Sequence, residues 1–398
     1  MTSEWNHSTI NDVCVLVTDG SHSSPKSVND GKYMVSVKDF TDYGFDFASC
    51  RMISNDDYET LKRNGCVPQI DDILIGKDGA RFFEDIIIFR QREKPALLSS
   101  IAILRCDKSK ILPDFLYYVL RTPSFRQDVK DNYGSGSAIP RIILKDFKRM
   151  MVSYPSLEKQ QAIISVLTAI DSKIQANTEI NDNLYEIVNA YYTSLFKDVE
   201  CEMTTIGNYA ERIYSGGTPT TSNAAYWDGT FGWFSSGETR NRFVISTEKS
   251  ITQTGIDNSS TKLASKHDIV MASAGQGFTR GQTSMLLIDT YVNQSVIVIH
   301  ADRNILPYLF WNLANRYEEL RAISDSSSIR GSLTTKMIAA FEIPCANNDV
   351  IQTFSGFAWA VIPQIENNLL ENERLAALRD SLLPKLMTGE IDVSAIQL

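Results

Sequence analysis

The sequence predicts an α+β protein in which two similar mixed domains are joined by two long antiparallel helices that form a coiled coil. Three observations support this. The chain of 398 residues exceeds one ordinary domain, its two halves match in order, and each half ends in a long segment with helical apolar spacing. We expect mixed domains at residues 1–155 and 201–345, helical spacers at 156–200 and 346–398, and a pseudo-twofold internal repeat.

Matched residues recur in order along both halves of the chain. The offset between matches falls from 196 at Gly20 and Gly216 to 194 at Pro113 and Pro307, and then to 191 at Leu184 and Leu375. A drifting offset indicates two copies of one module with loops of different length. Chance similarity is the alternative, and the collinear order of the matches argues against it.

The first part of each copy has short apolar runs bounded by turn residues, which is typical of strands. We predict strands within 71–75, 85–89, 100–104, 269–272 and 295–299. Pro113 and Pro307 each precede an apolar, aromatic run, and proline in a first turn favours a helix start. These segments therefore predict compact α+β domains.

The second part of each copy has the pattern of a long helix. Residues 157–197 lack glycine and proline, and their seam comprises Ile163, Leu167, Ile170, Ile174, Asn177, Asn181, Leu184, Val188, Tyr191 and Leu195. The second seam comprises Ile351, Phe354, Ala358, Val361, Ile365, Asn368, Asn372, Leu375, Leu378, Leu382 and Leu386, and Pro363 and Pro384 predict a break or kink in it. We expect the two helices to pair antiparallel, with the asparagines setting the register. The alternative is that each helix packs only on its own domain.

Composition and charge exclude several classes of protein. The N-terminus does not resemble a signal peptide, no apolar run reaches the length of a membrane span, and the six cysteines are scattered, so we expect a cytoplasmic protein without a zinc site. The net charge of −9 argues against a free-standing nucleic-acid binder. That charge is concentrated in the spacers: residues 1–155 and 201–345 carry net charges of 0 and −1, whereas 156–200 and 346–398 carry −4 each.

Catalytic motifs are missing from the sequence. It contains no P-loop, no Asn-Pro-Pro-aromatic or Asp-Pro-Pro-Tyr run typical of amino-methyltransferases, and no His-Glu-x-x-His. Asp71 and Asp72 suggest a nuclease metal site, but His267 and Asp268 stand at the matching place, so a turn before a strand is the better interpretation. His267 is for the same reason interpreted as structural. A methyltransferase or nuclease in its own right is therefore disfavoured.

Several segments resemble one known family. Residues 155–163 (PSLEKQQAI) resemble the first conserved region of type I restriction–modification specificity subunits, and residues 378–391 (LRDSLLPKLMTGEI) resemble their C-terminal region closely. The openings 19–25 and 215–219, and the segments 72–76 and 268–272, resemble parts of the family's target recognition domains. The second conserved region departs from the family: residues 344–351 (PCANNDVI) stand where Pro-x-Leu-x-x-Gln is expected, which leaves the start of the second helix open.

The resemblance implies a non-catalytic subunit with two target recognition domains, each recognising one half of a bipartite, asymmetric site in double-stranded DNA. The helices would set the gap between the halves. Two modification (methyltransferase) subunits would dock on the chain and bring S-adenosylmethionine. Two restriction subunits would add ATP- and Mg-dependent translocation and cleavage, so no cofactor is expected on this chain. The alternative is a repeat-built protein-interaction scaffold that does not recognise DNA.

Base recognition uses Arg, Lys, Asn and Gln side chains presented in the major groove, so the candidates lie in polar loops next to the matched strands. The candidates in the first domain are Lys77, Asp78, Arg81, Ser135, Ser137, Arg141 and Lys145. The candidates in the second are Trp233, Ser235, Ser236, Thr239, Arg240, Ser273, Gln276, Thr279, Arg280, Gln282, Ser328, Arg330 and Lys336. Candidates for docking basic partner surfaces are Glu158, Glu179, Asp182, Glu186 and Glu371, for which a merely solvated helix face is the alternative.

Overall fold

The computed structural model describes residues 5–134, 140–196, 202–275, 278–326 and 331–393. The chain divides into two compact units: unit 1 comprises residues 1–172 and 375–398, and unit 2 comprises residues 173–374. Each unit therefore combines a mixed domain with one end of each long helix.

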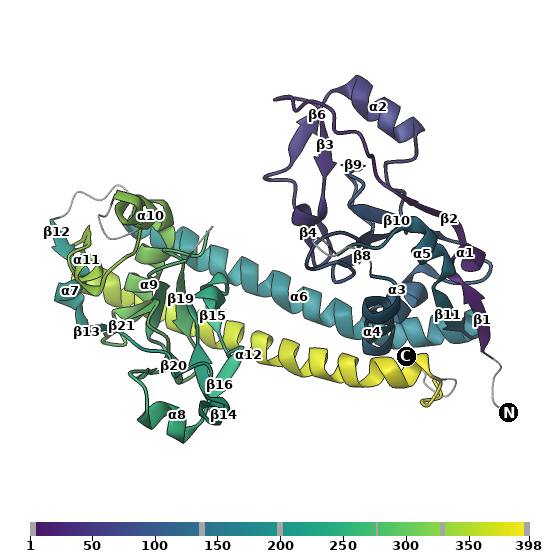
Figure 1. Ribbon diagram of the computed structural model, residues 1–398. Coiled ribbons are helices and arrows are strands. Elements are labelled where there is room, and N and C mark those ends of the chain that lie inside the picture. The colour runs from purple at the N-terminus through teal and green to yellow at the C-terminus, as the bar shows by residue number, and fades with distance from the viewer. Residues whose placement is uncertain (1–4, 135–139, 197–201, 276–277, 327–330, 394–398) are drawn as a thin grey trace. The chain divides into compact units, whose positions relative to one another are not determined.

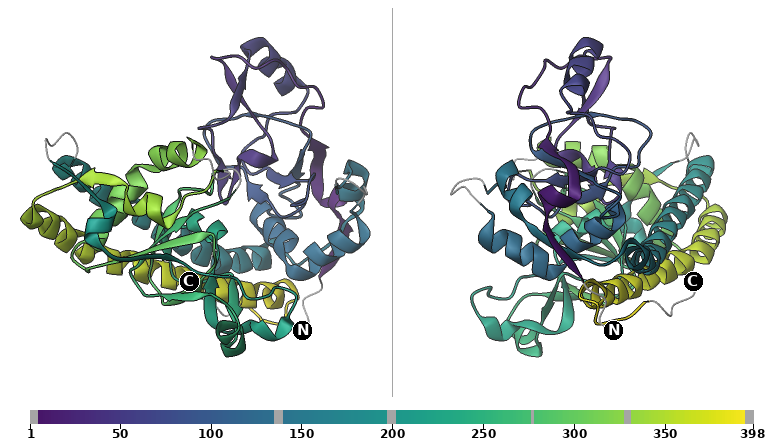
Figure 2. Two further views of the ribbon diagram at one scale, coloured as in Figure 1. Left: turned by 60° about the vertical axis from the view of Figure 1, so that its left-hand side comes forward. Right: turned by 90° about the vertical axis from the view of Figure 1, so that its right-hand side faces the viewer.

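Unit 1 is built around a four-stranded antiparallel sheet in the order β2-β10-β7-β8. These strands are β2 (Cys14–Asp19), β10 (Ile101–Cys106), β7 (Ile73–Gly76) and β8 (Ile86–Ile88). A smaller sheet has β6 (Arg51–Ile53), β3 (Lys32–Val35) and β9 (Ala96–Leu97), and lies with α2 (Asn55–Arg63) at the end of the unit away from the long helices (Figures 1 and 2). The remaining elements are β1 (Asn6–Thr9), α1 (Ile10–Val13), η1 (Val37–Asp39), β4 (Phe40–Thr41), β5 (Gly44–Phe45), α3 (Pro113–Arg121), α4 (Pro123–Asn132), α5 (Leu144–Arg149) and β11 (Met151–Tyr154).

Unit 2 repeats this plan with the sheet β13-β21-β18-β19-β15. Its strands are β13 (Ala210–Ser215), β21 (Val296–Ala301), β18 (Ile269–Ala272), β19 (Thr283–Leu286) and β15 (Phe243–Val244). The second sheet contains β16 (Lys249–Ile251), β14 (Trp227–Phe234), β20 (Thr290–Val292) and β17 (Lys262–Ala264). The other elements are β12 (Met203–Thr205), α7 (Ile206–Tyr209), η2 (Ala224–Tyr226), η3 (Ser236–Arg240), α8 (Gln253–Asp257), α9 (Leu306–Asn315), α10 (Tyr317–Ser326), α11 (Thr335–Ala339) and β22 (Glu342–Pro344).

The predicted repeat is confirmed by matching topology. Strands β2, β10, β7 and β8 correspond to β13, β21, β18 and β19, and the pairs β1-β11 and β12-β22 close the two units in the same way. Gly20 and Gly216 also match, because a Cβ at either position would lie within 2.5 Å of a backbone carbonyl oxygen. The glycine is therefore required at both openings by the close approach of a neighbouring strand end.

The two long helices are α6 (Leu157–Phe196) and α12 (Asn348–Met387). In unit 2 the Asn177 Nδ2 donates a hydrogen bond of 2.9 Å to Asn372 Oδ1, and the Asn368 Nδ2 donates one of 2.8 Å to Asn181 Oδ1. Partner numbers fall along α12 as they rise along α6, so the helices run antiparallel, as the asparagine seams predict (Figure 1). These bonds exclude the alternative in which each helix packs only on its own domain.

The expected break in the second helix is wrong. Helix α12 continues through Pro363 and Pro384 to Met387, and it begins at Asn348. Pro363 is exposed, while Ile362 and Ile365 on either side of it are buried in the core of unit 2. Tertiary packing on this face offsets the backbone hydrogen bond that proline removes.

Each unit has one main apolar core to which both helices contribute. In unit 1, Ile163 and Leu167 of α6 and Leu386 of α12 pack with residues of α3 and the sheet. In unit 2, Tyr192 of α6 and Phe354 of α12 pack with the buried residues of α9. Within the described parts of the chain, no helix is long and apolar enough to cross a membrane.

Candidate nucleic-acid interface

A buried aspartate positions the start of the central strand in each unit. The Asp72 carboxylate is fully buried and accepts two hydrogen bonds of 2.8 Å from Arg105. The matching Asp268 is also buried and lies 2.6 Å from the His300 Nδ1. The interpretation of these aspartates as a turn before a strand agrees with the structure.

His267 and Asp71 stand before these aspartates with positive φ angles of 80° and 70°. The His267 ring contacts Trp359 at a centroid distance of 4.7 Å, and burial lowers the pKa of His267 below its ordinary value. Its surroundings are therefore those of a structural histidine, as predicted.

The loop that follows this strand has the same backbone frame in both units. The Lys77 N–H donates to the Ser100 carbonyl (2.9 Å), and the matching Ser273 N–H donates to the Ser295 carbonyl (2.8 Å). The carbonyls of Lys77 and Ser273 in turn accept from Ile142 (3.0 Å) and Leu333 (2.8 Å). Two loops that are distant in sequence are thereby joined at one place in each unit.

In unit 1 this frame brings together five of the predicted contact residues. Lys77 is buried, and its Nζ lies 3.4 Å from the Asp19 carboxylate and 3.6 Å from that of Asp78. The backbones of Asp78 and Arg141 form an isolated antiparallel β-bridge. Arg81 is 72% exposed beside Asp85, and Arg141 and Lys145 are also exposed. Ser135 and Ser137 lie outside the described residues.

In unit 2 the frame carries different side chains. Arg280 is largely buried, donates to the Gly331 carbonyl at 2.6 Å, and pairs with Asp325. Ser273 is buried, Thr279 and Gln282 are half-buried, and Lys336 is exposed. Gln276, Ser328 and Arg330 lie outside the described residues.

The third predicted cluster adjoins the second frame. The Thr239 hydroxyl lies 3.4 Å from Gln282 Oε1, while Ser235, Ser236 and Glu238 form the capped turn η3. Trp233 is buried, and its indole N–H donates to the Gly217 carbonyl (3.3 Å), so this side chain belongs to the domain interior and not to the exposed surface. Arg240 is exposed and pairs with Glu248.

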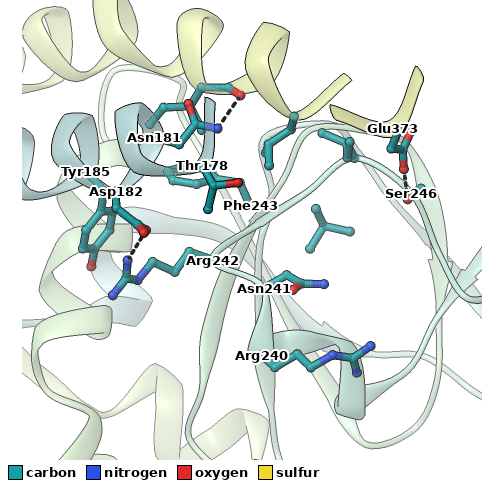
Figure 3. A pocket seen from close by; sticks show the side chains of 14 residues that line it. Thr178, Asn181, Asp182, Tyr185, Arg240, Asn241, Arg242, Phe243, Ser246 and Glu373 are labelled. Atoms are coloured by element: carbon teal, nitrogen blue, oxygen red, sulfur yellow. Dashed lines mark hydrogen bonds and ion pairs between the residues drawn. The ribbon is translucent and has the colours of Figure 1, made fainter. Parts of the chain in front are cut away.

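A cavity of about 500 Å³ lies between this cluster and the helices in unit 2 (Figure 3). Arg242 turns toward Asp182 of α6 at 3.5 Å and covers the Tyr185 ring at 4.2 Å, whereas Arg240 turns away (Figure 3). The segment that contains the predicted contacts is therefore attached directly to the long helices within unit 2.

The predicted docking residues differ in their availability. Glu158, Glu179 and Glu186 are exposed on α6. Asp182 pairs with Arg242, and Glu371 accepts from Asn177 (2.7 Å) and pairs with Lys173 (3.2 Å). The last two therefore have partners inside unit 2.

Sequence reasoning missed two residues beside the frames. Lys38 lines a cavity of about 540 Å³ together with Asp78 and Arg81, because the turn η1 brings it there from another part of the chain. Phe278 is 80% exposed in the loop after β18. The sequence shows a phenylalanine two positions before Arg280, but it does not show that the side chain of this phenylalanine is exposed.

The first helix begins with a motif whose role is explained by the structure. Gln160 is fully buried, donates to the carbonyls of Pro155 and Lys110 (3.0 Å each), and accepts from the Leu112 N–H (2.8 Å). At the second helix start the Tyr308 hydroxyl donates to the Pro344 carbonyl (2.6 Å). This substitute anchor accounts for the missing glutamine of the second motif.

The profile of a family described as "Type I restriction modification DNA specificity domain" matches residues 2–186 and 199–349 of the chain. The chain belongs to this family. It is therefore a specificity subunit of the type I restriction–modification class, the non-catalytic member of such systems, and recognition of DNA sequence is the function of its family.

Relatives and a solved structure agree with this membership. The chain is similar to the type I restriction enzyme HindI specificity subunit of Haemophilus influenzae, with 21% identity covering 73% of this chain and 80% of the relative. It is also similar to the EcoR124I/EcoR124II specificity subunit of Escherichia coli, with 25% identity over 62% of each chain. A crystal structure of a type I S subunit from M. genitalium has the same fold, with a TM-score of 0.57 at 16% identity over 97% of this chain and 96% of that one.

Proposed function

We propose that this specificity subunit recognises a bipartite, asymmetric site in double-stranded DNA, with each mixed domain recognising one half. One observation supports this most strongly. The same hydrogen-bonded frame recurs in both units, but it carries Lys77, Asp78 and Arg81 in one and Ser273, Thr279 and Arg280 in the other. Two equal frames with unequal side chains would recognise two different base sequences.

Direct recognition in the major groove uses a few exposed polar side chains held on a rigid support. Arg81, Arg141 and Lys145 meet that description in the first domain, and Lys336 does so in the second, where Thr279 and Gln282 are half-buried. Lys77 and Arg280 would act by holding the loops, since both are largely buried in ion pairs within their units, whereas Arg81 stays exposed beside Asp85. Ser135, Ser137, Gln276, Ser328 and Arg330 remain proposed contacts.

The helices would determine the spacing between the two half-sites. Helix α6 contributes Leu157 to Ser172 to unit 1 and the rest, to Phe196, to unit 2, without interruption. The stretch from residue 171 to Phe196, where α6 ends, corresponds to about 40 Å at ~1.5 Å per residue. At ~3.4 Å per base pair this equals roughly 11–12 base pairs, near one turn of the duplex.

Partner subunits would supply the chemistry. Two modification subunits would bring S-adenosylmethionine, and two restriction subunits would bring ATP- and Mg-dependent translocation and cleavage. The exposed carboxylates of Glu158, Glu179 and Glu186 on an acidic spacer would attract basic partner surfaces. Near-neutral recognition domains are consistent with a DNA clamp shared with these partners.

The deciding experiment is sequencing of methylated bases in a host genome with this gene present and with it deleted, together with its modification subunit. We expect a two-part methylated motif that disappears on deletion. Exchange of the loop 77–82 for that of another specificity subunit should change one half of the motif only. A protein-interaction scaffold would leave the motif unchanged in both experiments, which would refute the proposal.

A further inference from the structure

Three arginines line one cavity in unit 1. Arg121 at the end of α3, Arg126 in α4 and Arg379 in α12 surround a space of about 320 Å³ together with Tyr118 and Asp380. Arg379 is neutralised by Asp171 and Asp380, each at 2.9 Å. The other two arginines are not compensated in this way.

Arg121 lies over the Tyr117 ring at 4.9 Å and donates to its hydroxyl. Arg126 donates one hydrogen bond, from Nη2 to the Glu84 carbonyl at 3.3 Å, and its Nε is buried with no partner among the described residues. In the described parts of the chain, no carboxylate lies within ion-pair distance of either guanidinium. A buried donor without an acceptor is costly, so this cavity favours an occupant with acceptor oxygens.

The electrostatics agree with the geometry. Burial, followed by repulsion from Arg121, lowers the pKa of Arg126 below its ordinary value. Two positive groups beside one cavity repel each other, and an anion between them would offset both this repulsion and the cost of burying Arg126.

The matching place in unit 2 lacks this feature. Asn312 and Asn315 replace Tyr118 and Arg121 there, and Asn315 donates to Asn189 at 2.7 Å. The one arginine beside that cavity, Arg316, is paired with Glu319 at 2.6 Å. The pair of arginines without a carboxylate at ion-pair distance among the described residues is therefore a property of unit 1 rather than of the repeat.

We propose that the Arg121–Arg126–Arg379 cavity binds a phosphate-type oxyanion through the guanidinium groups of Arg121 and Arg126. Planar guanidinium groups match such oxygens with paired, charge-assisted hydrogen bonds. The favoured source is a backbone phosphate of the bound duplex, and this assignment rests on the proposed function. Arg126 bonds the carbonyl of Glu84, and Arg81 of the candidate interface pairs with Glu84 (4.0 Å) and Asp85 (2.8 Å), so the cavity adjoins that interface.

The first experiment needs no DNA. Thermal unfolding of the full chain is followed with inorganic phosphate and with chloride at equal ionic strength. Phosphate should raise the unfolding midpoint of the wild type, and Arg126→Gln or Arg121→Gln should weaken phosphate binding roughly tenfold through the loss of charge-assisted hydrogen bonds. Arg92→Gln is the matched control, because Arg92 is exposed and lies outside the cavity.

The second experiment measures DNA affinity of the complex with modification subunits against salt concentration. Arg126→Gln should weaken binding to all sequences alike and reduce the salt slope by about one counterion, whereas Arg126→Lys, which keeps the charge, should retain most of the slope. Should phosphate bind while the slope stays unchanged, the site takes free phosphate and the DNA source is wrong. Equal unfolding midpoints in phosphate and chloride, together with an unchanged salt slope, would overturn the oxyanion site itself. The cavity would then hold water or a carboxylate of a partner subunit. This result would not depend on whether the chain recognises a DNA sequence.

Discussion

Lengthening both helices at once tests whether they set the spacing of the recognised site. The division between the two units lies after Ser172 in α6 and after Arg374 in α12. The contacts Asp171–Arg379 and Tyr118–Asp171 lie on one side of these points, and those of Asn177 and Asn181 lie on the other. Four helix-forming residues inserted at both points would therefore leave the contacts within each unit in place.

Four residues add about 6 Å of helix at ~1.5 Å per residue. At ~3.4 Å per base pair this corresponds to between one and two base pairs of additional spacer. We expect the spacer to grow by that amount while both half-site sequences remain as they are.

An insertion in α6 alone is the control for register. With one helix longer than the other, the Asp171–Arg379 ion pair and the Asn177–Asn372 hydrogen bond could not form at the same time. Leaving a buried amide unpaired costs about 1–3 kcal/mol. The single insertion should therefore lower stability and methylation together.

The assay is sequencing of methylated bases in cells that carry each variant with its partner subunits. An unchanged spacer with full methylation after the double insertion, or altered half-sites, would refute the role of the helices as the spacing element.

Further changes test other parts of the argument. Arg141→Ala should cost about 1–3 kcal/mol of DNA affinity and relax one position of the site if it contacts a base, or weaken all sequences alike if it contacts phosphate; binding assays that show neither would remove it from the interface. Arg280→Ala should weaken binding through loss of loop order, with a lower unfolding midpoint as its signature. Phe278→Ala should reduce DNA affinity without lowering that midpoint, and a stability loss would instead mark it as a packing residue. Asn177→Leu removes the amide donor to Asn372 and one of the two partners of Glu371, and urea unfolding should show a loss of stability. The purified chain should neither bind S-adenosylmethionine nor hydrolyse ATP, and saturable binding in a calorimeter would contradict the assignment of methyl transfer to partners.

The candidate interface could be predicted only in part. Proximity to the matched strands selected Lys77, Arg81 and Arg280 equally, because all three stand in polar loops. Their availability differs: Arg81 is paired with Asp85 but stays exposed, whereas Lys77 and Arg280 are largely buried in their pairs with Asp19 and Asp325. The partners of Lys77 and Arg280 come from distant parts of the chain, so no local sequence pattern shows which basic side chain is paired and buried inside its domain.

The sequence by itself determined the repeat, the central strands and the extent of the first helix, because apolar periodicity and turn residues act over a few neighbouring positions. It also determined that the asparagines lie on the helix seams. Only the tertiary structure decided the register in which Asn177 meets Asn372, the continuity of α12 through Pro363, and the grouping of Arg121, Arg126 and Arg379 around one cavity. Each of these depends on which distant side chains are packed against the residue, and packing and charge pairing across the fold outweigh local preference.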